Sequence, residues 1–568
     1  MKGPQKFLVL FVFAFITIGS SATDIYIAQN AAGANTGADC NDAHSASWFN
    51  SSSNWGNAAG QIGAGTTVHL CGTFTGAGGN PGPNMLTFHG SGASNNPIML
   101  LFESGAALNA PAWGWGGIAA INLNANSYIT IDGGTPCGTT QGGLDSPTKC
   151  NGVIQNTANG MGKQYNQSSY AIEAGNTSNV EIRNLGIYNL YVHTAEEGQG
   201  SCSSEVDQTQ VAAVHVDGST GVSIHDSDIH DVGWAIPGVV FGSFQVFNNQ
   251  IYNMDHGLAF GNSKNTNASG PILVHDNHFG SMANWDAEPA NCDHHDGVHF
   301  WSQQNSNSGT IDNVYIYNNQ WDGDPGTGMN DYIFVEQAVN NVYVFNNDMA
   351  PASSVGGHCV GCIGLGNKSP STASGMYAFN NTVRATGLGY SSGTGAYFSE
   401  TSDNAWINNA VQGQNTLVAF GINGGDDPTP CSSISTLSGC VLSNAYENLQ
   451  ADGGTLNAFG YHSNNAPSLA TWQSGSPYLD SHYGADSGAL ILSLASFKLN
   501  SDGTPVSGSP LIQAGTNLTP LCTGNLAALC SDKSGVTRPA NGSWDIGAYE
   551  YGSAPAPAPP TSLSAVVQ

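Results

Sequence analysis

The segment 284–301, NWDAEPANCDHHDGVHFW, is the part of the sequence with the most side chains that could do chemistry. Its ionisable residues are Asp286, Glu288, Asp293, His294, His295, Asp296 and His299. Paired carboxyl groups can cleave glycosidic bonds, because one protonates the leaving oxygen while the other acts as nucleophile or base. Neighbouring imidazoles can orient a carboxyl group or shift its proton. We therefore take this segment as the candidate site.

A second acid–histidine pair, Asp255 and His256, occurs earlier in the sequence NMDHGLAF. Matching Gly257 to Gly297 places His256 level with Asp296, and Asp255 level with the residue before it. Residues that are level in neighbouring parallel strands lie roughly 5 Å apart. The two segments are therefore expected to form one site.

The predicted site has catalytic and substrate-binding members. Asp296 is the first choice for a catalytic carboxylate, with Asp255 or Asp293 as its partner. The predicted substrate-binding residues are His256, His295, His299, Tyr315, Tyr317, Asp331 and Glu336. Further acidic or histidine residues lie in flanking repeats, namely His225, Asp228, His230, Asp231, Asp322 and Asp324.

A recurring pattern indicates how these residues are held. The pattern is apolar–x–apolar–x–Asn/Asp–x–x–apolar, with the Asn or Asp at 184, 226, 248, 276, 318, 346 and 380, and weaker copies near 407–411 and 443–449. Alternation with period two indicates a strand with one buried face. Consecutive copies are 22 to 42 residues apart, which fits one turn of a coil plus loops of varying length.

A second apolar strand accompanies most copies, as in 238–241, 257–260, 297–300, 332–335, 363–365, 396–398 and 417–420. We predict an all-β fold, a right-handed parallel β-helix of roughly 10–12 coils with an N-terminal cap. The Asn or Asp of each copy is expected to face inward, where its amide would hydrogen-bond to the coils above and below.

Aromatic residues occupy the outward positions of consecutive copies: Tyr315, Tyr317, Tyr343, Phe345, Tyr377 and Phe379. Sugar rings stack on exposed aromatic faces, so these residues could line a glycan site. Alternatively, long loops fold back over them.

The bulk composition limits the partners. The chain of 568 residues has 11 Lys and Arg against 40 Asp and Glu, a net charge of −29. Such a charge disfavours nucleic acid and anionic membranes. The expected partner is a neutral or weakly acidic polysaccharide. We expect the protein to be a monomer that does not insert into a membrane.

The ends of the chain and the cysteines indicate export. Lys2 and Lys6 precede an apolar run that ends near Ile18, so residues 1–22 read as a signal peptide and the protein as secreted. The 12 Cys should form disulfides in an oxidising compartment. The pairs expected from proximity are Cys40–Cys71, Cys137–Cys150, Cys431–Cys440 and Cys522–Cys530, and the pairing of Cys202, Cys292, Cys359 and Cys362 stays open.

The predicted organisation continues from the signal peptide. Residues 23–130 form an N-terminal cap and the first coils, and residues 131–551 form the β-helix with a C-terminal closing segment. Residues 552–568 form a Pro/Ala-rich linker and tail.

Two coils resemble those of polygalacturonases, glycosidases of the pectin lyase-like β-helix superfamily. DGVHF at 296–300 resembles their NTDG coil, and DHGLAFGNS at 255–263 resembles their GHG coil. The resemblance implies a catalytic role for Asp296 and His256. The sequence departs from the family because the two coils are in reverse order and the adjacent Asp–Asp and the RIK triplet are missing.

Two other function classes remain. A Ca²⁺-dependent polysaccharide lyase would need a basic residue such as Arg183, Arg384, Lys163, Lys264 or Lys368, and none lies in the acidic segment. No cofactor or metal ligand is predicted, although Ca²⁺ could bind Asp residues and a metal could bind His294, His295 and His299. A non-catalytic adhesin or glycan-binding β-helix is the third class, because fold alone does not determine function.

Overall fold

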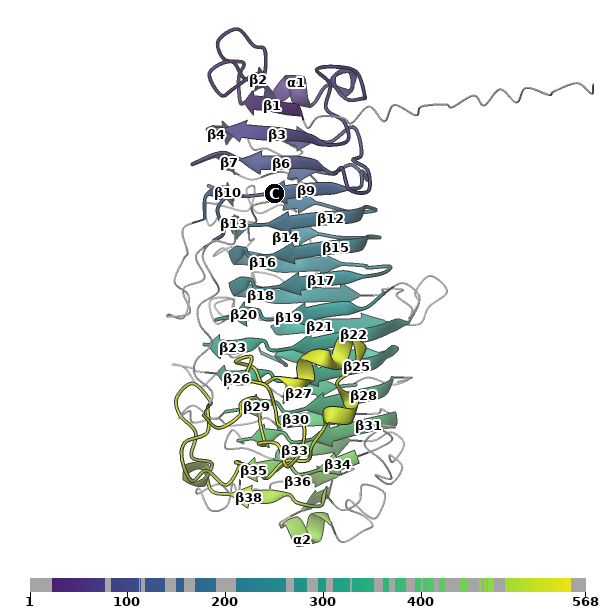
Figure 1. Ribbon diagram of the computed structural model, residues 1–568, viewed down its shortest axis with the longest axis vertical. Helices are drawn as coiled ribbons and strands as arrows, with labels where there is room; N and C mark the ends of the chain where they lie inside the picture. Colours follow the sequence, from purple (N-terminus) through teal and green to yellow (C-terminus); the bar gives the residue numbers. More distant parts are fainter. Residues whose placement is uncertain are drawn as a thin grey trace, which may run out of the picture.

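The computed structural model describes a long solenoid of stacked strands (Figure 1). It describes residues 23–552 except for 77–82, 112, 114–117, 138–149, 158–168, 191–210, 262–269, 283–294, 303–309, 327–328, 352–360, 367–372, 385–393, 400–401, 413–417, 424–439, 448–458, 462–463, 467 and 474–485. The predicted signal peptide and nearly all of the predicted tail lie outside the described residues.

One side of the solenoid is a parallel 14-stranded sheet in the order β2-β1-β3-β6-β9-β12-β15-β17-β19-β22-β25-β28-β31-β34. Its strands are β1 Thr23–Ala28, β2 His44–Ser45, β3 Thr66–Cys71, β6 Ile98–Phe102, β9 Ile129–Asp132, β12 Ser178–Arg183, β15 Thr220–His225, β17 Phe244–Phe247, β19 Ile272–His275, β22 Ile311–Tyr317, β25 Val339–Phe345, β28 Ser374–Phe379, β31 Ser402–Ile407 and β34 Cys440–Leu442.

A 24-stranded sheet supplies the other two sides, because its strands pair in two separate stacks. One stack contains β4 Thr73–Thr75, β7 Ala107–Ala110, β10 Gly152–Asn156, β13 Leu185–Leu190, β20 His278–Phe279, β23 Gln320–Gly323, β26 Asp348–Pro351, β29 Thr382–Val383, β32 Ala410–Val411, β35 Ala445–Glu447 and β38 Leu490–Leu492. The other contains β5 Leu86–Thr87, β8 Ala119–Asn122, β11 Ser169–Glu173, β14 Val211–His215, β21 Asp296–Ser302, β24 Ile333–Gln337, β27 Gly361–Leu365, β30 Thr394–Ser399, β33 Val418–Asn423 and β36 Phe459–Tyr461.

Two long strands belong to both stacks, β16 Asp228–Gly238 and β18 Gln250–Gly261. Among the described strand pairs only β36 with β37, Asn464–Ala466, is antiparallel. Parallel pairing of each strand with its counterpart one turn later gives a three-sided coil, and such crossovers are right-handed. The predicted right-handed parallel β-helix is therefore confirmed.

Short helices lie near the two ends of the solenoid and along its side (Figure 1). They are α1 Ala46–Phe49, α2 Leu469–Trp472 and the 3-10 helices Ser52–Asn54, Leu494–Ser496, Thr519–Leu521 and Gly524–Cys530. The hydroxyl of Ser45 caps α1 by accepting a hydrogen bond from the backbone N–H of Trp48. The buried Phe49 packs onto the core of the first coils. No helix among the described residues is long and apolar enough to cross a membrane.

The core is a column of stacked aliphatic and aromatic side chains. On the first sheet Ile224, Val246, Val274, Ile316 and Val344 pair in register, each fully buried. Repeating the same apolar position in each coil places like side chains directly above one another. The period-two pattern of the sequence is thus the inward face of this sheet.

A buried ladder of asparagine amides is present, but in each coil the ladder residue lies one position after the predicted one. The Nδ2 atoms of Asn249, Asn277, Asn319, Asn347, Asn381 and Asn409 each donate to the Oδ1 of the next asparagine in the following coil, the last being Asn444, over 2.9–3.3 Å. The predicted positions, such as Asn248 and Asn318, instead adopt positive φ values of 54° and 55°. Asn and Asp tolerate this conformation, so the first residue turns the chain and the second enters the core.

The C-terminal segment 497–552 runs back along the outside of the solenoid, drawn in yellow in Figure 1. Its Leu518, Leu521, Leu529 and Trp544 pack against Tyr315, Phe345, Tyr377 and Phe379 of the first sheet. Tyr315 is 8% exposed and Phe345 is fully buried. The alternative interpretation of the aromatic positions is therefore correct for these residues, with the C-terminal segment as the cover.

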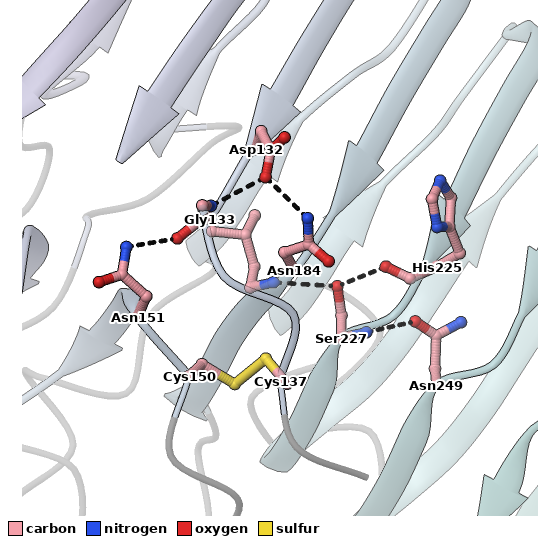
Figure 2. Close-up of a disulfide and its surroundings, with 11 residues drawn as sticks. Asp132, Gly133, Cys137, Cys150, Asn151, Asn184, His225, Ser227 and Asn249 are labelled. Atoms are coloured by element: carbon pink, nitrogen blue, oxygen red, sulfur yellow. Dashed lines mark hydrogen bonds between the residues drawn. A yellow bond between two sulfur atoms is a disulfide. The ribbon is translucent and has the colours of Figure 1, made fainter. Parts of the chain in front are cut away.

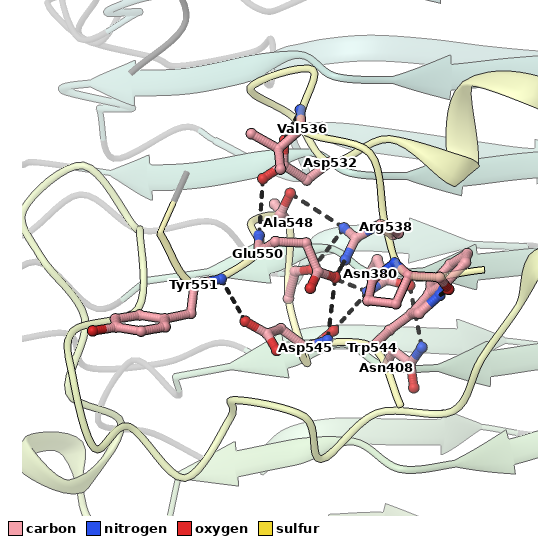
Figure 3. A network of polar contacts seen from close by, with 12 residues as sticks. Asn380, Asn408, Asp532, Val536, Arg538, Trp544, Asp545, Ala548, Glu550 and Tyr551 are labelled. Carbon is pink, nitrogen blue, oxygen red and sulfur yellow. Dashed lines mark hydrogen bonds and ion pairs between the residues drawn. The ribbon is translucent and has the colours of Figure 1, made fainter. Parts of the chain in front are cut away.

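Arg538 fastens this segment, as Figure 3 shows. It is 2% exposed and donates to Glu550 over 2.5 Å and to the side-chain oxygen of Asn346 over 3.0 Å. Asn380 donates to the carbonyl of Asp545 over 3.0 Å. The outward Asn side chains of the coils thus become the attachment points of the closing segment.

Three predicted disulfides are present: Cys40–Cys71, Cys137–Cys150 and Cys522–Cys530. Figure 2 shows Cys137–Cys150, whose cysteines lie between β9 and β10, and the later coil in which the backbone N–H of Ser227 donates to Asn249 at the start of the amide ladder. Cys362 and Cys440 are also disulfide-bonded. The predicted partner of Cys440, residue 431, lies outside the described residues, as do Cys202, Cys292 and Cys359.

Candidate active site

The predicted alignment of the two acid–histidine segments is confirmed by the register of β18 and β21. His256 pairs with Asp296, and both lie near the middle of the solenoid, where Figure 1 places β18 and β21. Gly257 and Gly297 allow these strands to approach. A Cβ at Gly257 would lie 2.3 Å from the Gly297 carbonyl oxygen, so larger residues would push the strands apart.

The side chains form an alternating chain of carboxylates and imidazoles. His256 contacts Asp255 through Nδ1 at 2.7 Å and Asp296 through Nε2 at 3.3 Å. His299 contacts the same Asp296 oxygen, Oδ2, through Nδ1 at 3.2 Å. Its Nε2 lies 3.1 Å from Glu336. Asp296 is therefore the centre of the chain.

Two further predicted residues join it. His295 Nδ1 lies 2.8 Å from Asp255 Oδ1. The backbone N–H of Asp331 donates to Asp296 Oδ1 over 3.3 Å. We call the set Asp255, His256, His295, Asp296, His299, Asp331 and Glu336 the carboxylate–histidine cluster; seven of the ten predicted site residues lie in it.

The cluster is almost excluded from solvent. Asp296 is fully buried, while His256 is 4% and His299 is 7% exposed. Removing a charged group from water costs free energy unless opposite charges and hydrogen bonds compensate. The alternation of acids and imidazoles provides this compensation.

The same contacts set the protonation of the cluster. Burial by itself would lower the pKa of His256, but Asp255 and then Asp296 raise the pKa to about 10. Burial would raise the pKa of Asp255, yet His256 and His295 hold it well below its usual range. The pKa of His299 is also raised, because Asp296 and Glu336 outweigh the effect of burial. At neutral pH the proton shared by Asp255 and His256 therefore lies on the imidazole.

Aromatic side chains that sequence reasoning missed surround the cluster. The indole N–H of Trp234 donates to Asp255 over 2.9 Å, and its ring lies 4.5 Å from His256. Trp301 lies 4.4 Å from His299, and the two indoles meet edge-on at 6.4 Å. Both indoles are partly exposed. A signal for both residues exists in their positions, because Trp234 is level with His256 in the register of β16 and β18, and Trp301 follows His299 by two residues.

Tyr397 is another residue that the sequence did not reveal. Its hydroxyl donates to Asp331 over 2.8 Å from β30, two coils away. Burial and then the charge of Asp331 raise the pKa of Tyr397 far above its usual range, so the hydroxyl keeps its proton. It thus holds the segment whose backbone binds Asp296.

The other predicted residues lie elsewhere. Asp293 and His294 lie outside the described residues. Tyr315 and Tyr317 belong to β22 in the first sheet; Tyr315 is covered by the C-terminal segment, and Tyr317 stacks on Phe345 at 4.8 Å. These two tyrosines are therefore not part of the cluster, which corrects their prediction as members of one site with Asp296.

The flanking acidic residues make pairs of their own. His230 binds Asp231 over 2.6 Å, and His278 binds Asp322 over 2.6 Å. His225 lies in the first sheet, where it contacts Glu181 and Asp226.

The described candidates for a lyase base are engaged in ion pairs. Arg183 binds Asp132 over 2.8 Å and Glu181 over 2.9 Å. Arg384 binds Asp348 over 2.7 Å and is 6% exposed. Neither contacts the cluster, whereas Lys163, Lys264 and Lys368 lie outside the described residues.

Comparisons with known proteins find a likeness of fold. The sequence matches no protein-family model and no curated protein. Pectate lyase Pel9A is 14% identical, covers 94% of this chain and 98% of its own, and has a TM-score of 0.38. A Family 28 exopolygalacturonase of Yersinia enterocolitica is 12% identical over 64% of this chain and 71% of its own, with a TM-score of 0.37.

The surface adhesin PfbA of Streptococcus pneumoniae is similar to the same degree. It is 12% identical, covers 65% of this chain and 87% of its own, and has a TM-score of 0.37. Likenesses this weak assign no activity. The parallel pairing of its coil strands, β36 with β37 being the antiparallel exception among the described pairs, shows that the protein is a right-handed parallel β-helix.

Proposed function

We propose that the protein is an exported enzyme that hydrolyses a neutral or weakly acidic polysaccharide at the carboxylate–histidine cluster. The observation that carries the proposal is the buried chain Asp255–His256–Asp296–His299–Glu336. Ionisable groups with strongly shifted pKa values, grouped with specific partners, are characteristic of functional sites.

The β-helix itself does not need these charges. The column of outward residues that contains His299 has Ala259 one coil earlier, then Phe334 and Gly364 in the next two coils. Uncharged residues therefore fill the same position elsewhere. Because burying an ionic chain is seldom the most stable solution, its presence in these coils supports a local function.

The proposed roles follow from the protonation of the cluster. Asp296 is the catalytic carboxylate, and the imidazolium of His299, the most exposed of the cluster histidines, supplies the proton to the leaving oxygen. Asp255 is a positioning residue, since it contacts Asp296 only through His256. This assignment revises the expectation that Asp255 is a second catalytic carboxylate.

The surroundings favour a glycan substrate. Trp234 and Trp301 present partly exposed indoles beside His256 and His299, and sugar rings stack on such surfaces. The net charge of −29 disfavours a highly anionic chain. Hydrolysis is preferred to elimination because Arg183 and Arg384 are held in ion pairs away from the cluster.

The test is product analysis with the purified mature protein on a panel of neutral and uronate polysaccharides, with and without Ca²⁺ or a chelator. We expect new reducing ends without unsaturated product. Asp296→Asn should remove the activity, whereas the matched control Asp276→Asn, an exposed acid paired with His275, should retain it. Unsaturated, Ca²⁺-dependent product would identify a lyase, and binding without any product would identify an adhesin.

A further inference from the structure

We propose that His256, Asp296 and His299 form a binding site for a divalent transition-metal ion, with Zn²⁺ as the best fit. The atoms that would bind the ion are His256 Nε2, Asp296 Oδ2 and His299 Nδ1. All three residues are buried, and these atoms lie within 4.8 Å of one another. Two imidazoles and one carboxylate, with a further position left for water, are a ligand set typical of zinc and related ions.

The distances fit a small tetrahedral ion. His256 Nε2 and His299 Nδ1 lie 3.3 and 3.2 Å from the same oxygen of Asp296. In a tetrahedral site with bonds of 2.0–2.1 Å, two ligand atoms are about 3.3 Å apart. Ca²⁺ fits less well, because it binds six to eight oxygen atoms and two of these three donors are nitrogens.

The outer contacts are those of a metal centre. His256 uses its other nitrogen, Nδ1, to bind Asp255 at 2.7 Å. His299 uses its other nitrogen, Nε2, to bind Glu336 at 3.1 Å. Histidine ligands commonly donate their second N–H to a carboxylate, which fixes the ring and makes the metal-facing nitrogen more basic. Both histidines have this partner, an arrangement that a simple ion pair does not require.

The carboxylate ligand is held in the same manner. Asp296 Oδ1 accepts the backbone N–H of Asp331 over 3.3 Å, so that Oδ2 faces the two histidines. Each of the three groups is thus oriented by a contact on the side away from the proposed ion. In addition, the ring of Trp234 lies 4.5 Å from that of His256, and the ring of Trp301 lies 4.4 Å from that of His299.

The inference shares its location with the proposed function but does not depend on a polysaccharide. A bound ion would take the place of the protons between Asp296 and the two imidazoles. Asp296 would then be a ligand, and the loaded and metal-free proteins would differ in reactivity. Metal binding is measured without substrate, so failure of either proposal is recognised separately.

The experiment is titration of the chelator-treated mature protein with Zn²⁺ by calorimetry and with Co²⁺ by visible absorption. We expect one equivalent of Zn²⁺ to bind per chain. His299→Ala and Asp296→Asn should weaken binding at least about 100-fold, and Glu336→Gln about 10–100-fold. His275→Ala, which removes the histidine of an outer His–Asp pair, should leave binding unchanged.

X-ray absorption of the wild-type protein loaded with one equivalent of Zn²⁺ gives a readout that needs no variant. Two imidazoles and oxygen ligands, without sulfur, are expected. The proposal is overturned if the wild type binds Zn²⁺ no tighter than His299→Ala, or if the spectrum shows fewer than two imidazoles.

Discussion

Tyr397 donates a 2.8 Å hydrogen bond to Asp331, although the two residues are 66 positions apart in the sequence. Gly364 lies in the strand between them, and a Cβ there would be 2.5 Å from both the Asp331 carboxylate and the Tyr397 hydroxyl. The backbone N–H of Asp331 in turn binds Asp296. The absence of a side chain at Gly364 therefore permits the support of the cluster's central carboxylate.

We predict that Gly364→Ala destabilises the protein more than Tyr397→Phe. The methyl group added at Gly364 overlaps both polar groups and must displace them. Tyr397→Phe only removes one hydrogen bond, which leaves the Asp331 carboxylate without the Tyr397 donor at a cost of about 1–3 kcal/mol. Urea unfolding followed by circular dichroism measures both. The double variant should lose less free energy of unfolding than the two single variants lose together. Losses that are strictly additive would contradict the proposed contact.

Substitution of an asparagine at the centre of the amide ladder should destabilise the protein. Asn319 accepts from Asn277 and donates to Asn347 and to the Val274 carbonyl, with distances of 2.9–3.1 Å. Asn319→Ala leaves buried partners unsatisfied in two coils, so we expect a loss of about 2–5 kcal/mol in the free energy of unfolding. The exposed Asn57 provides the control, because Asn57→Ala should change stability by less than about 0.5 kcal/mol. Equal effects of the two substitutions would show that the ladder adds no stability.

A buried acid at the end of this ladder should make stability depend on pH. Burial raises the pKa of Asp486 to about 7, although Tyr446 and Asn444 donate hydrogen bonds to it. A carboxyl group whose pKa is raised in the folded state stabilises that state fully below the pKa it has in the unfolded chain. This contribution to the free energy of unfolding is lost as pH rises through about 7.

Asp486→Asn should therefore stabilise the protein relative to wild type at pH 8, by on the order of 2–4 kcal/mol, but not at pH 4. Unfolding curves at the two pH values measure the difference between variant and wild type. A difference that is the same at both values would contradict the raised pKa of Asp486.

The attachment of the C-terminal segment 497–552 to the coils should depend on the buried guanidinium of Arg538. Arg538→Met leaves Glu550 without its charged partner and Asn346 without a donor, at a cost of about 3–5 kcal/mol. We expect the segment to become sensitive to protease while the coils remain folded. Lys498→Met, which changes an exposed cation in the same segment, serves as the control. Equal protease resistance of the two variants would show that Arg538 does not fasten the segment.

Trp301 should contribute to glycan binding. Its partly exposed ring lies next to His299, so Trp301→Ala should weaken affinity for the active polysaccharide about tenfold through loss of stacking. Trp48→Ala, at the N-terminal cap, should have no effect. Affinity electrophoresis in gels containing the polysaccharide compares the two variants. Unchanged migration of Trp301→Ala would exclude this face as the binding surface.

The sequence by itself determined the coil and the centre of the candidate site. Period-two apolar positions repeated once per turn can all be buried only by stacking, so the parallel β-helix followed from the pattern. The paired glycines at 257 and 297 then fixed the register that brings His256 beside Asp296. The disulfide between Cys137 and Cys150 followed from the short separation of the two cysteines in the sequence.

Only the tertiary structure decided the rest. The sequence does not show which residue of each Asn pair takes the left-handed turn, and that choice moved the ladder from Asn318 to Asn319. Tyr315 was equally compatible with an exposed or a covered position until a segment some 200 residues later was seen to pack on it. Tyr397 and Asp331 meet across two coils because Gly364 between them has no side chain. Loops of irregular length separate these coils, so the contact cannot be read from residue spacing.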